Sequence, residues 1–367
     1  MSETVAKGYE IEVAGETDGG NRVPNLSPRE ALERWLNKLR VSKSESTVSA
    51  YHYRLKHFVE WCEETQIDSV SEVSGWDIES YETTRRQRGL EPVTLNNELG
   101  TLKNFFEYCA RIELVDESLP KKVDPPTVDA ADQVDKTRLH TDDAKALLEF
   151  YDSDRNERGS RGHALLALAW YTGARLGALR GLDLEDYNRD AQCVEFTHRP
   201  RKDTPLKNGQ NGERVVGLPG HVCEIVNRYI RTDRLDEFDD HGRRPLFTSQ
   251  VGRPSPNGIR AWMGLATVPC LHSSCPHGNE RETCDYLNYS NVSKCPSSRS
   301  PHQVRTGSVT WQLNRGIPAG RVAERVNTSV EVLLRHYDQQ SKMEEMRERR
   351  RPYLDQLSFD TEEGDGQ

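Results

Sequence analysis

The sequence predicts a mainly α-helical protein with a small β-sheet, an α+β fold class, in two domains. Three observations lead to this prediction. Apolar residues recur at helical spacing along much of the chain, and two short β-type runs flank a loop rich in glycine, asparagine and lysine. A proline-containing acidic stretch divides the chain, whose 367 residues exceed what one compact core usually holds.

Residues 25–112 are expected to form a small all-helical domain. The stretch "LSPREALERWLNKLR" carries a helix start, because Ser27 can cap the helix, Pro28 suits its first position and Glu30 completes a capping box. Further helices are expected at 44–65, 74–89 and 92–112. Two of them carry apolar stripes that would form the core of this domain.

The net charge of −9 is concentrated at the two ends of the chain. Residues 1–20 and 356–367 each carry a net charge of −4, which leaves −1 for the body. The tails 1–24 and 356–367 are poor in apolar residues and are predicted to be disordered, and 113–135 is predicted to be a linker. A near-neutral body can still carry local basic surfaces.

Arginine outnumbers lysine 37 to 13, which suits phosphate recognition, although a base-rich genome or a high-salt habitat gives the same bias. The longest apolar run, 164–171, has eight residues, whereas a membrane span needs about 20. The N-terminus has no apolar signal region. We therefore expect a soluble, cytoplasmic protein with no membrane partner.

The second domain is expected at 136–355. Thr141 is predicted to cap its first helix, and "CVEFTH" and "RVVGL" are predicted strands joined by the loop "RPRKDTPLKNGQNGE". More helices follow on both sides of a cysteine-rich insertion at 268–297. This half of the chain contains the residue types that suggest chemistry.

One candidate is Tyr337, in the stretch "LLRHYDQQS". The apolar residues of this region share one predicted helical face with it; they are Val326, Val330, Leu333 and Leu334. By this spacing alone, Tyr337 is better explained as a core residue than as a nucleophile.

Two further motifs are individually weak. Arg175 follows a Thr-Gly turn in "YTGARLGALRGLDLED", where an arginine is more often a surface residue than part of a site. His302 and Arg305, in "SPHQVRTGS", are three residues apart and would lie on one side of a helix. Their order along the chain is more informative than any one of them.

The series of arginine after Thr-Gly, lysine in a hairpin loop, His-x-x-Arg and then tyrosine resembles the tyrosine recombinase family of phage lambda integrase and Xer proteins. The resemblance covers about residues 25–350. It implies a SAM-like, DNA-clamping core-binding domain at 25–112 and a catalytic domain at 136–355. The stretches "LKNGQNGERVVGLP" and "CPSSRSPHQVR" are most similar to integrases of halophilic archaea.

The resemblance also implies roles for single residues. Tyr337 matches the nucleophile, Arg175 and Arg305 match the two arginines that hold the phosphate oxygens, and His302 matches the general base. Lys207 matches the lysine that protonates the leaving 5′ oxygen, with Lys202 as the rival. The product would be a 3′-phosphotyrosine.

The chemistry accounts for these residue types. A phenol titrates near 10 and is a weak nucleophile until a neighbour takes its proton. Two guanidinium groups can stabilise the charge of the phosphorane without a metal, and a lysine can supply a proton to the leaving oxygen. No cofactor is expected for catalysis.

Two positions depart from the family pattern. Ala178 stands where the family often has glutamate, and "ERVNTS" replaces the usual Leu-Gly-His turn. Asn327 and Thr328 are the residues there that could still bond a phosphate oxygen. The departures leave a catalytically weakened, DNA-binding regulator as one alternative, and a type IB topoisomerase-like enzyme as another.

Four cysteines cluster in the insertion, and with no secretion signal they favour a metal over disulfides. Cys270, Cys275, Cys284 and Cys295 suit a structural zinc site, with His277 as an alternate ligand. Free cysteines in a polar loop are one alternative to this site, and an insertion that serves as a zinc-dependent interaction surface is another.

Double-stranded DNA is the expected partner, bound by a homo-tetramer on paired sites with possible accessory DNA-bending proteins. Basic residues on both domains could contact the DNA backbone, although each alone is better explained as a solvated charge. The candidates are Lys43, Arg54, Lys56, Arg85, Arg86, Arg88, Lys103, Arg199, Arg201, Lys202, Arg243 and Arg244.

Overall fold

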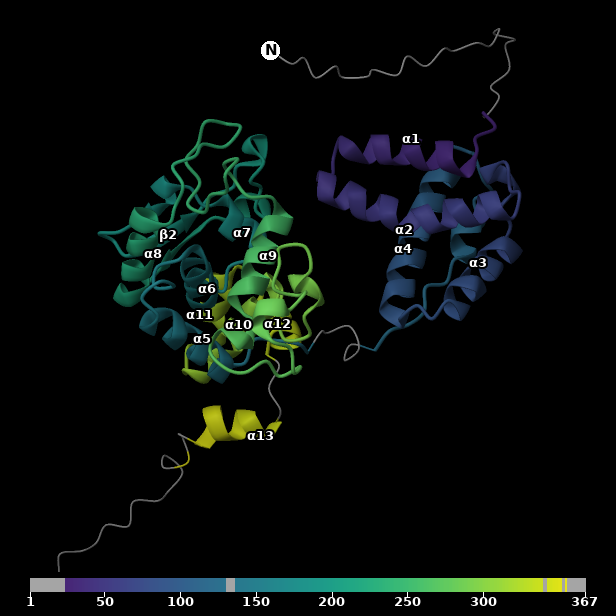
Figure 1. Ribbon diagram of the computed structural model, residues 1–367. Helices are drawn as coiled ribbons and strands as arrows, with labels where there is room; N and C mark the ends of the chain where they lie inside the picture. The colour runs from purple at the N-terminus through teal and green to yellow at the C-terminus, as the bar shows by residue number, and fades with distance from the viewer. Residues whose placement is uncertain (1–23, 130–135, 339–341, 352–353, 355–367) are drawn as a thin grey trace, which may run out of the picture. The chain divides into compact units, whose positions relative to one another are not determined.

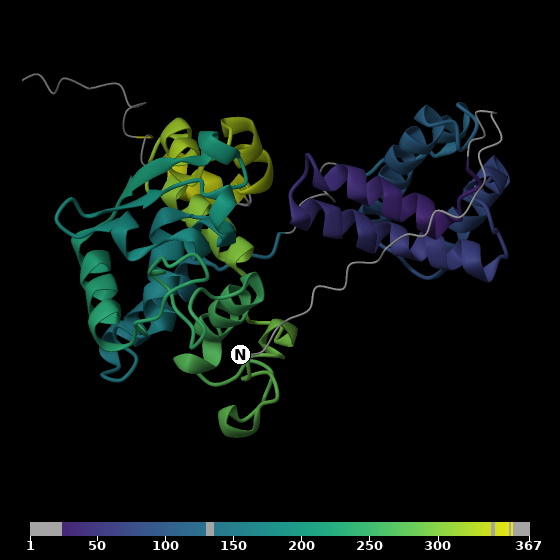
Figure 2. The same ribbon diagram turned by 90° about the horizontal axis from the view of Figure 1, so that it is seen from above.

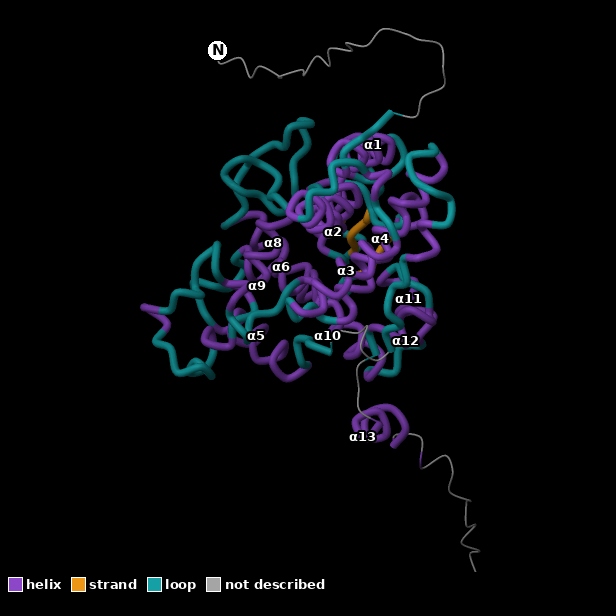
Figure 3. Tube along the Cα trace, turned by 90° about the vertical axis from the view of Figure 1, so that its right-hand side faces the viewer, coloured by secondary structure: helices purple, strands orange, loops and turns teal. Residues whose placement is uncertain are grey.

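The computed structural model describes residues 24–129, 136–338, 342–351 and 354 (Figure 1). The chain divides into two compact units, Met1–Val134 and Asp135–Gln367. Almost all of the two tails predicted to be disordered, and the end of the predicted linker, lie outside the described residues. The mainly α-helical class with a small sheet is confirmed (Figure 3).

The first unit is built from helices and short 3-10 turns. Its helices are α1 (Pro28–Arg40), α2 (Glu45–Glu64), α3 (Gly75–Gln87) and α4 (Pro92–Arg111). The predicted capping box is confirmed: the backbone N–H of Ser27 donates to Glu30 at 2.9 Å, and the Ser27 hydroxyl accepts from the Glu30 N–H at 3.3 Å. The apolar faces of α1, α2 and α4 meet in one core, where the Trp35 ring stacks on Tyr51 at 5.4 Å.

The second unit surrounds one nearly all-apolar helix. Its helices are α5 (Thr141–Ser153), α6 (Arg161–Thr172), α7 (Leu176–Gly181), α8 (Gly220–Thr232), α9 (Pro256–Ala266), α10 (Pro301–Asn314), α11 (Ala319–Val326), α12 (Val330–His336) and α13 (Lys342–Glu345), which a π-helical turn at Met346–Arg350 extends. Helix α6 packs against α5, α8, α9 and α10, so it is the centre of the core.

A three-stranded antiparallel sheet flanks these helices, in the order β1 (Tyr187–Asn188), β2 (Cys193–Phe196), β3 (Arg214–Gly217). Val194 pairs with Val216 in the register of β2 and β3. Both predicted strands are therefore present. The sequence pattern missed β1, which has only two residues and no alternation to detect.

The expectation of one helical face from Val326 to Tyr337 is wrong. Asn327 has a left-handed backbone (φ 53°) and ends α11, and Ser329 caps a new helix, α12. Because the helix is broken, Val330 and Leu334 are exposed at 40% and 49%, while Val326 and Leu333 are buried. Thr141 is likewise the first residue of α5 rather than its cap, which is His140.

The cysteine-rich insertion, residues 268–297, connects α9 to α10 in the second unit (Figure 2, green). It contains only three short 3-10 turns, at Pro269–Leu271, Arg281–Thr283 and Val292–Lys294. Among the described residues, every helix is too short or too polar to span a bilayer.

Candidate active site

Arg305 lies in α10, a helix with a complete N-terminal cap. Ser300 and Gln303 form its capping box, and Pro301 occupies its first turn. The Arg305 side chain is fully buried, and its Nη1 donates to the carbonyls of Gly173 (2.6 Å) and Val326 (2.7 Å). Within the described chain, its Nε and Nη2 have no hydrogen-bond partner. Two donors of a buried guanidinium are thus left for a ligand.

Tyr337 is the C-terminal cap of α12 and is 5% exposed. The Arg305 guanidinium lies 4.7 Å from the centre of its ring, and the His302 ring lies 5.5 Å from it. The Thr310 hydroxyl donates to the Tyr337 carbonyl at 2.8 Å, which ties the end of α12 to α10. The structure therefore brings His302, Arg305 and Tyr337 together.

Arg175 reaches the same place from α7. Gly173 ends α6 with a left-handed backbone (φ 60°), and a Cβ there would lie 2.6 Å from a Val326 methyl group. This tight turn puts Arg175 at the N-cap of α7, where its Nη1 donates to the Asn327 carbonyl at 2.6 Å. Arg175 and Arg305 are thus anchored to the adjacent carbonyls of Asn327 and Val326.

Asn327 joins the helical part of the site to the β2–β3 hairpin. The Asn208 amide donates to the Asn327 side-chain oxygen at 2.8 Å, and the Asn327 amide donates to the Asn211 carbonyl at 3.4 Å. The left-handed backbone of Asn327 turns its side chain toward this loop. Gly212 leaves room for that side chain, because a Cβ at Gly212 would lie only 2.9 Å from the Asn327 amide nitrogen.

Lys207 and Lys202 occupy different parts of the hairpin. Lys207 is exposed and directly precedes Asn208, so the contact with Asn327 holds its backbone beside the site. Lys202 is exposed in a 3-10 turn whose carbonyl accepts from Arg243 at 2.7 Å, on the side of the loop that faces the α8–α9 connection. The geometry favours Lys207 over Lys202.

Arg214, on β3, is a residue that the sequence pattern did not single out. It donates to the carbonyls of Arg325 (2.8 Å) and Gly212 (3.0 Å), and it stacks on Phe196 at 4.3 Å. Burial lowers its pKa to about 9, and the charges of Arg305, Arg175 and Arg325 act in the same direction. An arginine at a strand start has no local signal that separates this position from a surface one.

The site carries uncompensated positive charge. Burial lowers the pKa of Arg305 to about 10; the charge of Arg175 acts in the same direction, and Tyr337 opposes it. Among the described residues, Arg175, Arg214 and Arg305 form no ion pair with a carboxylate. Buried cations without counter-charges are costly, and an anion would relieve that cost.

Comparison with known proteins shows the family of this chain. Residues 32–112 match the family model for the phage integrase N-terminal SAM-like domain. An N-terminal domain of a phage integrase/site-specific recombinase from Haloarcula marismortui is 49% identical over 28% of this chain and 100% of that one, with a TM-score of 0.28. The XerC tyrosine recombinase of Bacillus pumilus is 26% identical over 62% of this chain and 72% of its own. The chain belongs to the tyrosine recombinase family.

The fold of this tyrosine recombinase is also found in a DNA complex. The Tn1549 transposon integrase, solved with transposon right-end DNA, has a TM-score of 0.61 and 17% identity, and the match covers 91% of this chain and 100% of that one.

The two departures from the family pattern have defined places in this recombinase. Ala178 is buried in α7 and packs in the main core. Thr328 is half-buried, and its backbone N–H donates to the Ala323 carbonyl at 2.9 Å. Of the two candidates in the replaced turn, Asn327 is the one whose side chain contacts the site.

Three of the proposed DNA-contacting arginines have structural roles instead. Arg85 is buried and forms two bonds with Glu98, at 2.9 and 2.7 Å. Arg199 bonds Asp186 at 2.9 and 2.6 Å, and Arg243 contacts Asp183 at 3.2 Å. Because these guanidiniums face carboxylates and are little exposed, we remove them from the candidates, whereas Lys43, Arg201 and Lys202 are exposed.

The four cysteines of the insertion are free thiols and are all half-buried. Within the described residues, no three His, Cys, Asp or Glu side chains stand in a preformed metal-binding group. His277, the predicted alternate ligand, instead bonds the Ser297 hydroxyl through Nε2 at 2.9 Å.

Proposed function

We propose that this tyrosine recombinase is a site-specific DNA recombinase that cuts and rejoins DNA strands through a 3′-phosphotyrosine. One observation carries the proposal: among the residues that the structure describes, the fully buried Arg305 has two donors without a hydrogen-bond partner, beside the ring of Tyr337. A phosphodiester is the anion that suits two adjacent guanidiniums and a tyrosine.

The residues divide the reaction as follows. Arg305 and Arg175 bind the non-bridging oxygens of the phosphate and stabilise the charge of the phosphorane. The Tyr337 oxygen forms a bond to phosphorus while His302 takes its proton, and the bond from phosphorus to the 5′ oxygen breaks. Lys207 gives a proton to that oxygen. The reverse steps, with another 5′ hydroxyl, rejoin the strands without an external energy source.

The remaining parts of the proposal concern the assembly. The substrate is double-stranded DNA, and the relatives that match include an integrase solved with DNA. We infer a homo-tetramer on two paired sites, with accessory DNA-bending proteins where the sites need them, and action on cytoplasmic DNA. Arg201 and Lys202, exposed near the hairpin, are the side chains best available for the DNA backbone in the second unit.

The test is covalent trapping on nicked DNA. DNA that carries the recombination site, nicked next to the cleavage position, loses its short 5′-hydroxyl fragment after cleavage and traps the enzyme. The unaltered chain should give an adduct that survives denaturing electrophoresis. Tyr337→Phe should bind the same DNA and give no adduct, because the ring stays and only the nucleophilic oxygen is lost. An adduct formed by the Phe variant would show that another residue is the nucleophile.

The alternatives give different outcomes in the same assay. Binding by the unaltered chain without any adduct would indicate a regulator that has lost catalysis. Relaxation of a supercoiled plasmid that contains no paired sites would indicate a topoisomerase-like activity.

A further inference from the structure

A hydrogen bond joins the two ends of the cysteine-rich insertion, and a small apolar cluster holds the part between them. The Arg299 N–H donates to the Thr267 hydroxyl at 2.8 Å, and that hydroxyl donates to the Met263 carbonyl of α9 at 2.8 Å. Between residues 269 and 300, all of which the structure describes, Val292 is the only buried side chain. It forms a small cluster with Ala261 and Val268, against which other residues of the insertion pack: Cys270, Leu271, Leu287 and Cys295.

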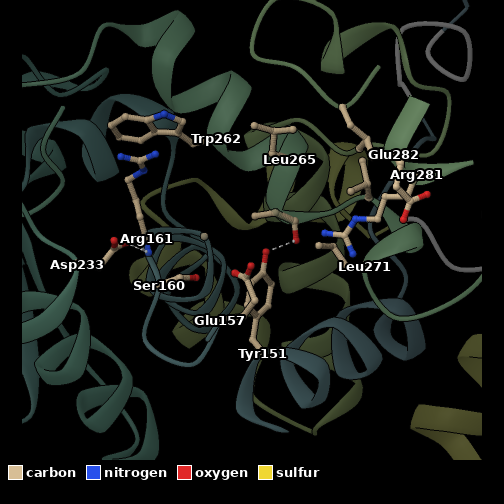
Figure 4. Close-up of a pocket in the computed structure, with 14 residues that line it drawn as sticks. Tyr151, Glu157, Ser160, Arg161, Asp233, Trp262, Leu265, Leu271, Arg281 and Glu282 are labelled. Atoms are coloured by element: carbon tan, nitrogen blue, oxygen red, sulfur yellow. Dashed lines mark hydrogen bonds between the residues drawn. The ribbon is translucent and has the colours of Figure 1, made fainter. Parts of the chain in front are cut away.

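The contact between the insertion and the rest of the unit is incomplete. A cavity of about 570 Å³ lies between them, lined by Tyr151 of α5, Arg161 of α6 and Trp262 of α9, and by Leu271 and Arg281 of the insertion (Figure 4). The Arg161 guanidinium stacks on Trp262 at 3.9 Å on one side of this cavity. The insertion therefore packs against α5 and α9 through two of its 3-10 turns, and this cavity separates another part of it from the unit.

The insertion has little regular secondary structure to order it. It contains three short 3-10 turns, and its backbone hydrogen bonds join residues that are close together in the sequence. Small segments of this kind are commonly held by disulfides or a metal, and the cysteines here are free thiols.

The four cysteines occupy similar local positions. The carbonyls of Cys275, Cys284 and Cys295 each accept a bond from the N–H three residues later, at 3.1, 3.0 and 3.2 Å, so each of these residues begins a turn. Cys284 and Cys295 also end 3-10 turns, and Cys270 lies inside one. All four are half-buried in a stretch of mostly exposed residues.

Contacts between the turns bring the cysteines to one region. His277 bonds Ser297, which joins the turn of Cys275 to the turn of Cys295. Arg281 donates to the Cys270 carbonyl at 3.5 Å, which brings the turn before Cys284 against Cys270. Cys270 and Cys295 also pack against the same small apolar cluster of Ala261, Val268 and Val292.

We propose that Cys270, Cys275, Cys284 and Cys295 bind one structural zinc ion. The side chains need to rotate inward from their positions in the structure, since no three of them form a metal-binding group there. Each thiol loses its proton to solvent as the ion binds, and four thiolates give the tetrahedral geometry that zinc prefers. The ion has no part in the phosphoryl transfer.

The site would stabilise the start of α10. Cys295 lies shortly before Ser300, the cap of α10, and this helix carries His302 and Arg305. Zinc would thus fix the loop end from which the two candidate catalytic side chains are positioned.

The test measures metal in the full-length chain, purified with reductant and dialysed against metal-free buffer. Mass spectrometry should find about one zinc per chain, and a mercurial thiol reagent should release it. Cys284→Ser should lower the zinc content severalfold. Cys193→Ser, a half-buried cysteine of β2, is the matched control and should keep the full content.

A conservative variant separates ligation from folding. Cys275→His should keep zinc, because histidine nitrogen is also a tetrahedral zinc ligand. Substitution with cobalt should give a thiolate-to-metal absorption band that Cys284→Ser weakens. The proposal is overturned if no zinc is retained, if Cys284→Ser and Cys193→Ser hold equal amounts, or if alkylation without reductant shows the four cysteines in disulfides. None of these readouts depends on recombination activity.

Discussion

Buried arginines in this recombinase differ in what faces them. Arg85 faces Glu98, and Arg243 faces Asp183, so each charge is compensated inside the fold. Within the described chain, Arg305 faces only backbone carbonyls and the ring of Tyr337. The first kind of arginine stabilises the fold. The second kind still needs a negative charge from a bound ligand, as expected for an anion site.

Arg85→Met should destabilise the first unit by roughly 3–5 kcal/mol, because it leaves the Glu98 carboxylate buried without its counter-charge. Urea denaturation of the variant measures this loss. The double variant Arg85→Met with Glu98→Leu removes both charges and should recover most of the stability. DNA affinity of the double variant should match that of the unaltered chain; a large loss of affinity would return Arg85 to the DNA-contacting candidates.

Two substitutions of Asn327 can separate the role of its backbone conformation from the role of its side chain. Asn327→Gly keeps the left-handed turn and loses the bond to Asn208, whereas Asn327→Ala loses the bond and strains the turn. Both variants should slow cleavage, by about tenfold or more, because the hairpin that carries Lys207 loses its anchor.

The two Asn327 variants should differ in stability. Only the alanine variant should lower the free energy of unfolding, by about 1 kcal/mol or more. Single-turnover cleavage and urea denaturation of the pair measure both effects. Equal cleavage rates in Asn327→Gly and the unaltered chain would exclude a positioning role for the amide.

At the scale of elements, the candidate site depends on the β2–β3 hairpin, and the test concerns its lysines. Lys207→Ala should slow cleavage at least a hundredfold, because the leaving 5′ oxygen then departs without a proton donor. A DNA with sulfur in place of that bridging oxygen should be cut by Lys207→Ala nearly as fast as by the unaltered chain, since a thiolate needs no proton to leave. Lys202→Ala is the matched control on the same loop and should cut both DNAs normally.

The opposite result would assign the role of proton donor to the other lysine. If sulfur substitution restores Lys202→Ala and not Lys207→Ala, then Lys202 is the proton donor, and the loop rearranges on DNA.

Helices with strong local signals were predictable from the sequence, while elements fixed by tertiary contacts were not. The Ser27 capping box and the alternating residues of β2 and β3 act within a few positions, so their patterns can be read directly. The break at Asn327 depends on bonds from Arg175 and Asn208, more than a hundred residues away. The apolar periodicity continued through that break and hid it.

The candidate site follows the same rule. The order of Arg175, Lys207, His302, Arg305 and Tyr337 predicted the constellation through a family resemblance, and the proximity of His302 and Arg305 to Tyr337 is observed. Arg214 was missed because its closeness to the other arginines arises only when β3 packs against the end of α11.

At the scale of the whole molecule, the two units have separate hydrophobic cores, so their stabilities can be perturbed separately. The second unit contains a titratable group at its centre. His163, in α6, is fully buried; its Nδ1 accepts a bond from the Gly159 N–H at 3.2 Å, and its ring stacks on Tyr151 at 5.2 Å. Burial lowers its pKa to about 4, and Arg158 acts in the same direction, while Asp152 opposes the shift.

This histidine should make the second unit sensitive to acid. Below about pH 6.5 the unfolded chain binds a proton at His163, and the folded chain does not until about pH 4. The stabilising contribution is therefore complete above pH 6.5 and is lost as the pH falls to 4, a total of about 3 kcal/mol. His163→Gln keeps an acceptor for Gly159 and removes the titration. Its urea midpoint at pH 7 should be lower than that of the unaltered chain, because the ring contact with Tyr151 is lost. Between pH 7 and pH 4.5, however, its stability should fall less steeply than that of the unaltered chain. Parallel slopes for the two proteins would mean that His163 takes up its proton at the same pH in the folded and the unfolded chain, and that other groups determine the acid sensitivity.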